Sequence, residues 1–321
     1  MIKHPILKLL TMILCFTSIK ASSQIAISNK AKFADLKNGT TFIAMKNPDD
    51  PSVKEYIDVI KDNWKLSKYK IIKYSEIEEN VKPNNYFLTI GGYETNTSTY
   101  NLVNGTKRGG INYSNTHLYL SLWTPKEKYF KKKKKKLSRS EHLELARIEL
   151  FTDFPTLANP QNIYLEDFHG GGHIRNWSAG LFKNQLQVLT NLVESKKERK
   201  LYAGFLNKSE LKKLKTNTLY VPEYTLFKFN KFSGSETKKH DKAELFKGYK
   251  KKYEIVSMKE LSEKILTSAK PIYYLIYIKS STDKFVSVIN SKTGELIYSK
   301  YSPTSYNIKS KDLAKLNALI R

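Results

Sequence analysis

The sequence predicts an α+β protein with two similar domains, each a mixed β-sheet flanked by helices, joined by a helical connector. Three observations predict this fold class. Short apolar strands alternate with amphipathic helices, the same order of elements occurs twice, and a strongly helical segment separates the two occurrences. We therefore expect a leader at 1–23, a first domain at 36–125, a connector at 126–215 and a second domain at 216–321.

The N-terminus has the pattern of a secretory signal peptide. Lys3 and Lys8 precede an apolar run at 9–19, and small residues follow at 21–23. The run is shorter than the ~20 residues that a membrane-spanning helix needs. We expect export to the periplasm or cell surface, with a buried N-terminal helix as the alternative. The only cysteine, Cys15, lies in this leader, which excludes disulfides and thiolate catalysis from the mature chain.

The first half shows the order strand, helix, strand, short helix, strand, strand. The predicted elements are a strand at 41–44, a helix at 53–64, a strand at 69–74, a short helix capped by Ser75 and Glu78, and strands at 86–90 and 116–123.

The second half repeats this order. Its predicted elements are a strand at 218–221, a helix at 242–249, a strand at 253–258, a helix at 259–266, and strands at 272–278, 285–289 and 296–298. An alignment matches two tyrosine pairs, Tyr69 with Tyr253 and Tyr86 with Tyr273. It also matches Glu76 with Glu260. These matches predict an internal duplication, and the alternative is chance similarity between two α/β segments.

The region between the halves has a different pattern. Ser138 and Glu141 predict a capped helix that runs to about Phe151. Residues 177–198 predict a long amphipathic helix, and 206–214 predict a short one.

Both halves resemble periplasmic α/β domains similar to the N-terminal domain of TolB and to CsgG-type envelope lipoproteins. The resemblance lies in the element order and in the stretch at 290–296, which is similar to a D-x-K-T-G-E hairpin with Gly294 at the turn. It implies a binding or assembly module without catalytic residues. The chain also resembles exported proteins of Bacteroidetes-type bacteria, through its Tyr-Lys-Ile-Ile strand and an aromatic residue near the end of the first helix.

One loop carries candidate chemistry. Its imidazole and carboxylate side chains could hold zinc or a similar ion. The candidate ligands are Glu166, Asp167, His169 and His173. The same loop offers a His-Gly-Gly-Gly oxyanion motif and a Ser178 elbow motif, so a hydrolase or metalloenzyme using 166–178 is one hypothesis. The alternative is an exposed glycine-rich loop capped by Asn176 or Ser178.

The positive charge suggests a second kind of site. The formal net charge of +26 favours polyanionic partners, although solvated surface lysines would give the same composition. A run of six lysines could bind anionic lipid, at roughly 1 kcal/mol for each residue. The run consists of Lys131, Lys132, Lys133, Lys134, Lys135 and Lys136.

These observations favour a non-enzymatic exported envelope protein that binds a protein partner or an anionic surface. The expected partners are an envelope protein or an anionic lipid or glycan, including peripheral association with a membrane. Export argues against nucleic acid as a partner. We expect no cofactor.

Overall fold

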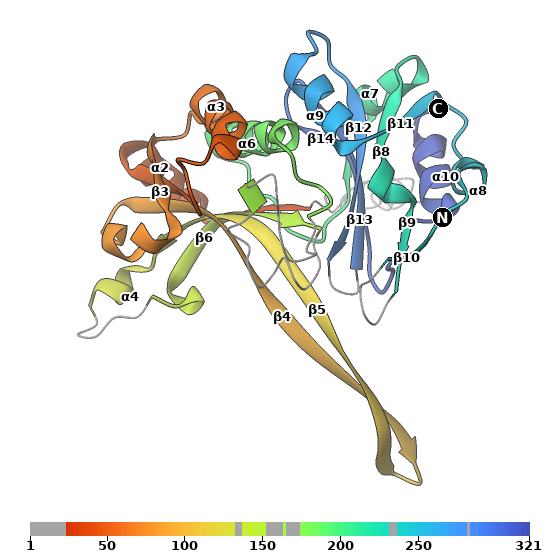
Figure 1. Ribbon diagram of the computed structural model, residues 1–321, viewed down its shortest axis with the longest axis horizontal. Helices are drawn as coiled ribbons and strands as arrows, with labels where there is room; N and C mark the ends of the chain where they lie inside the picture. The colour runs from red at the N-terminus through yellow and green to blue at the C-terminus, as the bar shows by residue number, and fades with distance from the viewer. Residues whose placement is uncertain (1–23, 132–136, 152–162, 165–173, 231–235, 281–282) are drawn as a thin grey trace, which may run out of the picture.

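The computed structural model describes residues 24–321 except 132–136, 152–162, 165–173, 231–235 and 281–282, and it leaves out the side chains of 97, 99 and 111–115. Within these residues the chain forms two mixed six-stranded sheets flanked by helices (Figure 1). The α+β class and the two similar sheet-bearing halves are therefore confirmed.

The first sheet has the strand order β1-β6-β5-β4-β2-β3. β2 is parallel to β3 and β4, and the other neighbours are antiparallel. The strands are β1 Ile25–Ile27, β2 Thr40–Met45, β3 Lys68–Lys73, β4 Asn85–Val103, β5 Thr106–Pro125 and β6 His142–Leu150. The helices of this half are α2 Phe33–Asn38, α3 Lys54–Asn63, α4 Glu127–Phe130 and α6 Ala179–Glu194.

The second sheet has the order β11-β8-β12-β13-β14-β7, with β8 parallel to β11 and β12. Its strands are β7 Phe205–Leu206, β8 Leu219–Pro222, β11 Tyr253–Val256, β12 Tyr273–Ser280, β13 Asp283–Asn290 and β14 Leu296–Ser302. The helices of this half are α7 Lys208–Leu211, α8 Lys242–Phe246, α9 Met258–Thr267 and α10 Ser310–Leu319. A separate pair consists of β9 Phe227–Phe229 and β10 Glu236–Lys239.

The two sheets have the same topology and register. Tyr69 and Tyr86 pair with the same residue of β2, and Tyr253 and Tyr273 both pair with Leu219 of β8. The tyrosine pairs that the sequence alignment matched thus occupy equivalent positions.

The two glutamates that the sequence alignment matched also have equivalent roles, as caps. The carboxylate of Glu76 accepts from the backbone N–H of Lys73 at 3.1 Å, and Glu260 accepts from Ser257 at 2.8 Å. The cap predicted from Ser75 is wrong, because the first-half turn starts two residues earlier and is 3-10 rather than α-helical.

The two halves lie side by side, and β12 of the second sheet contacts β5 and β6 of the first (Figure 1). α6 lies between the sheets, beside α3 and α9, while α8 and α10 cover the outer face of the second sheet. Apolar residues from both sheets and from α6 meet around a void of only about 20 Å³. They are Ile25, Ile148, Leu181, Val188, Ile276 and Ile289. One continuous core therefore joins the two halves.

The structure corrects the helix predicted at 138–151. His142–Leu150 form strand β6, which pairs with β1 and β5. A bulge at Leu145 explains the error, because it puts Glu144 and Arg147 on one face of the strand. This spacing of three is also the spacing of a helical face. Among its described residues, the region predicted as a helical connector is therefore helical only in α4, α6, α7 and short 3-10 turns.

A long β-hairpin, which we call the arm, projects from the first sheet (Figure 1). The strands predicted at 86–90 and 116–123 continue as β4 and β5 far beyond the other strands, and they pair with each other as far as Val103 and Thr106. Asn104 and Gly105 make the turn with φ of 52° and 75°. Two positive φ values in a two-residue loop match the right-handed twist of a hairpin.

The remaining local predictions are mostly confirmed. α6 covers most of the helix predicted at 177–198, and Gly294 has the positive φ expected at its turn, 71°. Among the described helices, none combines the length and the apolar character that crossing a bilayer requires.

Candidate functional site

The predicted metal and oxyanion residues lie outside the described residues. This applies to Glu166, Asp167, His169 and His173. Of the lysine run, only Lys131 is described, and it is exposed at the end of α4, whereas Lys132–Lys136 lie outside. Within the part of the chain that the structure describes, no group of three or more His, Cys, Asp or Glu side chains is arranged to hold a metal ion.

Ser178 caps a helix. Its hydroxyl accepts from the backbone N–H of Leu181 at 3.3 Å as the N-cap of α6. Asn176 is buried and accepts from the backbone N–H of Phe151 at 2.7 Å. The structural interpretation of Ser178, as a cap, is thus confirmed.

The structure instead reveals a cavity of about 350 Å³ on the face of the first sheet opposite α3 and α6. β4, β5, β6 and the turn before β6 line it, next to the root of the arm. The lining residues are Thr89, Gly91, Gly92, Tyr119, Ser121, Trp123, Arg139, His142, Glu144 and Arg147.

Strand alternation places these side chains together. In β4 and β5, Leu88 and Leu120 belong to the main core, whereas Thr89, Ser121 and Trp123 lie on the opposite face. The β6 bulge described above lets this strand contribute side chains from both sides of the irregularity to the same face.

Two guanidinium groups share the aromatic side of the cavity. The guanidinium carbon of Arg139 lies 4.2 Å from the ring centroid of Tyr93 and 5.0 Å from that of Tyr119. That of Arg147 lies 4.0 Å from Tyr119. At the other side, the rings of Trp123 and His142 are parallel, with centroids 3.5 Å apart. The site thus combines cations with flat apolar surfaces.

Arg147 is the most unusual residue of the site, because it is only 9 % exposed. Its Nε donates to Glu149 at 2.5 Å, but its Nη2 has no acceptor among the described residues. A buried guanidinium N–H without an acceptor loses the hydrogen bond that water would give it. Glu149 and the ring of Tyr119 thus hold the guanidinium in the wall of the cavity.

A buried polar network supports Arg147 from behind. The Ser280 hydroxyl, which comes from the second sheet, donates to Glu149 at 2.9 Å, and His117 Nδ1 lies 3.4 Å from that hydroxyl. Burial raises the pKa of Glu149, and the neighbouring Arg147 opposes this shift. The network fixes the guanidinium while tying the two halves together.

The cavity lining brings two arginines together with one imidazole and one carboxylate. Burial, and then the charge of Arg139, lowers the pKa of His142 to about 4, so its ring is neutral. Burial raises the pKa of Glu144, and the two arginines oppose the shift. The lining thus places Arg139 and Arg147 beside a neutral imidazole and Glu144, while Glu149 pairs with Arg147 from behind.

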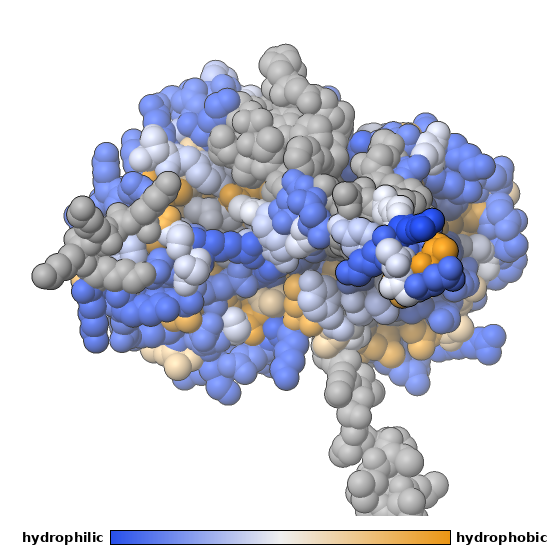
Figure 2. All heavy atoms as spheres, turned by 90° about the horizontal axis from the view of Figure 1, so that it is seen from below, coloured by the Kyte–Doolittle hydropathy of each residue, from blue (hydrophilic) through white to orange (hydrophobic). Residues whose placement is uncertain are grey.

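The arm carries a second exposed feature at its tip. Tyr100, Leu102 and Val103 are 53 %, 70 % and 46 % exposed, and they make up all but one of the exposed large apolar residues in the described chain. Lys107 lies over the Tyr100 ring at 5.1 Å, and Arg108 follows it. Figure 2, with the arm pointing toward the viewer, shows an apolar patch at its tip bordered by hydrophilic residues.

One sequence pattern is consistent with the cavity, although it is not specific enough to predict it. Residues 116–123 alternate leucines with polar and aromatic residues, which indicates one face that is not an ordinary core. Arg139 and Arg147 join that face only through the β6 pairing and its bulge. Trp177, for which we expect the most exposure among the three tryptophans, is buried against Tyr56.

Comparison with protein-family models, with curated proteins and with solved structures finds no match for this chain. The resemblance to periplasmic α/β domains therefore stays a prediction.

Proposed function

We propose that this chain is a non-enzymatic exported protein that binds an anionic glycan through the arginine cavity of its first half. The two arginines carry the proposal, because both line one cavity and Glu149 holds the buried Arg147 in its wall. Guanidinium groups bind carboxylates with matched geometry, and two of them meet here.

The rest of the lining favours a sugar acid over a simple inorganic anion. Tyr119 and Trp123 contribute aromatic rings to the lining, while Thr89, Ser121 and Glu144 contribute groups that hydrogen-bond hydroxyls. A cavity of about 350 Å³ also falls in the range of small-ligand sites, which starts near 300 Å³.

The test is calorimetric titration of the full chain with D-glucuronate, with D-glucose as the neutral control. We expect glucuronate alone to bind. Arg139→Gln should weaken binding about tenfold, because one charged hydrogen bond is worth about 1.5–3 kcal/mol. Arg139 is exposed, so this substitution should leave the fold intact.

Gly91→Leu tests the cavity itself. A Cβ at Gly91 would meet nothing within 4 Å, so the larger side chain fills the space without a clash and should abolish binding. Arg108→Gln, which removes the same charge from the arm tip, is the matched control and should bind normally. Equal weakening by Arg108→Gln would show non-specific attraction to a basic protein and reject the proposal.

A second candidate function is contact with an anionic bilayer through the arm tip. The exposed Tyr100, Leu102 and Val103 lie beside Lys107 and Arg108, the combination of apolar and basic residues found where proteins enter a lipid interface. Co-sedimentation with phosphatidylglycerol vesicles, compared with phosphatidylcholine vesicles, tests it. A chain with 94–116 replaced by Asn-Gly should lose binding to the anionic vesicles, and retained binding would exclude the arm.

A further inference from the structure

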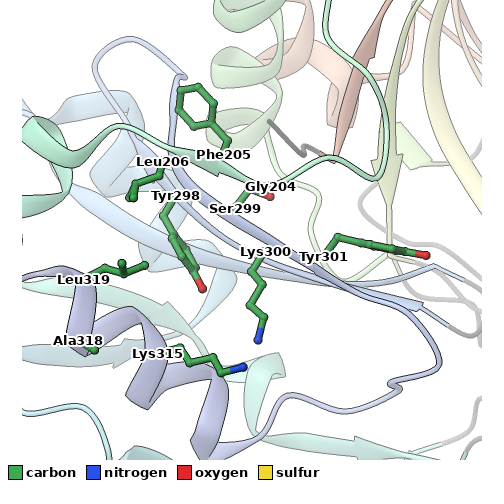
Figure 3. Close-up of a pocket in the computed structure, with 10 residues that line it drawn as sticks. All are labelled: Gly204, Phe205, Leu206, Tyr298, Ser299, Lys300, Tyr301, Lys315, Ala318 and Leu319. Carbon is green, nitrogen blue, oxygen red and sulfur yellow. The ribbon is translucent and has the colours of Figure 1, made fainter. Parts of the chain in front are cut away.

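A second cavity, of about 520 Å³, lies at one edge of the second sheet, between β14 and the last turns of α10 (Figure 3). It exists because the edge strand β7 is very short. Leu206 pairs with Tyr298 and Phe205 with Ser299, so from Lys300 onward β14 has no described neighbour on this side. The helix then covers an edge that no strand fills.

One wall of this cavity is apolar. Figure 3 shows Leu206, Tyr298 and Leu319 gathered on the same side of the space. Ala318 adds a small side chain from the exposed surface of α10. Such a wall suits a hydrocarbon chain, because burying apolar surface is favourable at roughly 25 cal/mol per Å².

The opposite wall carries an excess of positive charge. The amino groups of Lys300 and Lys315 point toward each other at the end of the cavity (Figure 3). The nearby carboxylate, Asp312, already accepts from the fully buried Lys284 and lies 3.6 Å from Lys300. No ion pair among the described residues includes Lys315.

Like charges held close together are unfavourable unless an anion joins them. Burial, together with Lys315, lowers the pKa of Lys300, which reflects this crowding. The ammonium groups of Lys284 and Lys300 share one carboxylate, that of Asp312, and Lys315 adds a third positive charge beside Lys300. The positive charge of the site therefore exceeds its negative charge.

We propose that this pocket binds an amphiphile with one apolar chain and a carboxylate or phosphate head group. The head group lies between Lys300 and Lys315, and the chain lies against Leu206, Tyr298 and Leu319. This site belongs to the second half and is independent of the arginine cavity.

The test is calorimetric titration of the full chain with dodecanoate and with dodecyl phosphate, which distinguishes the two head groups. Dodecanol and dodecyltrimethylammonium carry the same chain without the negative charge, and butyrate carries the charge without the long chain. We expect one or both anionic amphiphiles to bind, and the three other probes to bind at least tenfold more weakly.

Variants separate the two walls. Lys315→Met should weaken binding about tenfold, and Ala318→Phe should block the apolar space. Both residues are exposed, so both variants should fold, and unchanged thermal unfolding checks this. Lys311→Met removes the same charge from the same helix outside the pocket and is the matched control.

Two results would overturn the proposal: equal binding of the cationic amphiphile, or wild-type binding by both Lys315→Met and Ala318→Phe. Arg139→Gln should leave dodecanoate binding unchanged, so the two proposals can fail separately.

Discussion

The two sheets share strand order and register but differ on one face. In the second sheet that face carries Ile276, Ile278, Phe285 and Ile289, which are buried, and α6 and α9 lie over it. At the equivalent positions the first sheet carries Thr89, Gly91, Tyr119 and Trp123, which line the arginine cavity.

The hairpin at the end of this face differs as well. β12 and β13 end at Ser280 and Asp283, where the equivalent pair Tyr93 and His117 of the first sheet continues into the arm. The same backbone thus supports a layer packed against helices in one half and a face with a cavity and an arm in the other. On the first sheet, a small core cluster that includes Phe87 and Trp123 occupies only part of that face.

Exchanging one residue between the faces should give the largest effect. Ile278→Gly removes a fully buried side chain and should lower the free energy of unfolding by about 3–5 kcal/mol. The reverse change at the equivalent position, Gly91→Ile, meets open space and should change it by less than about 1 kcal/mol. Urea unfolding measures both, and equal losses would show that the open face is packed too.

Acidification should reveal the polar junction between the halves. Burial, then Arg147 and Arg139, lowers the pKa of His117 to about 4 from its ordinary 6.5. Between these values the unfolded chain binds a proton that the folded chain excludes, so stability is complete above pH 6.5 and falls as the pH drops toward 4.

For one histidine this loss is at most about 3 kcal/mol, at about 1.4 kcal/mol per pKa unit. His117→Gln should therefore lose less stability than the wild type between pH 7 and pH 4, measured by urea unfolding at each pH. The ring also faces Asp283, the Thr95 hydroxyl and the Ser280 hydroxyl, so the difference between the two proteins is the relevant quantity. Identical pH slopes would contradict the assignment.

Removing the arm should have the smallest effect on stability. Beyond Tyr93 and His117 its two strands pair only with each other among the described residues. A two-stranded ribbon is marginal by itself, so replacing 94–116 with Asn-Gly should change the free energy of unfolding by less than about 1 kcal/mol. A larger loss would show that the arm packs against the rest of the protein.

The fold was predictable where apolar periodicity and side-chain caps determine it. The tyrosine pairs and the two capping glutamates occupy equivalent positions because each is fixed by local pairing. Strand β6 was not predictable, because its bulge gives the side chains on one face the spacing of a helix. The arm was not predictable either, because its Thr, Asn, Ser and Gly residues cover no core and so give no apolar pattern.

The candidate sites depended even more on tertiary structure. Arg147 becomes distinctive only when the fold pairs it with Glu149 in the wall of the cavity. Lys300 and Lys315 come together only because β7 is short and α10 returns over the sheet edge. In a chain with so many lysines, neither arrangement stands out from the sequence.

The outward face of the first sheet, which carries the arginine cavity, also has a consequence for association between copies of the chain. A protein with one surface that complements a different surface of the same chain can add copies head to tail without limit, as in a fibre. On the first sheet, this face carries charged side chains and a cavity where an added helix would need an apolar surface to pack against. Because buried interfaces are depleted in charged residues, a face built in this way disfavours apolar packing against a second copy.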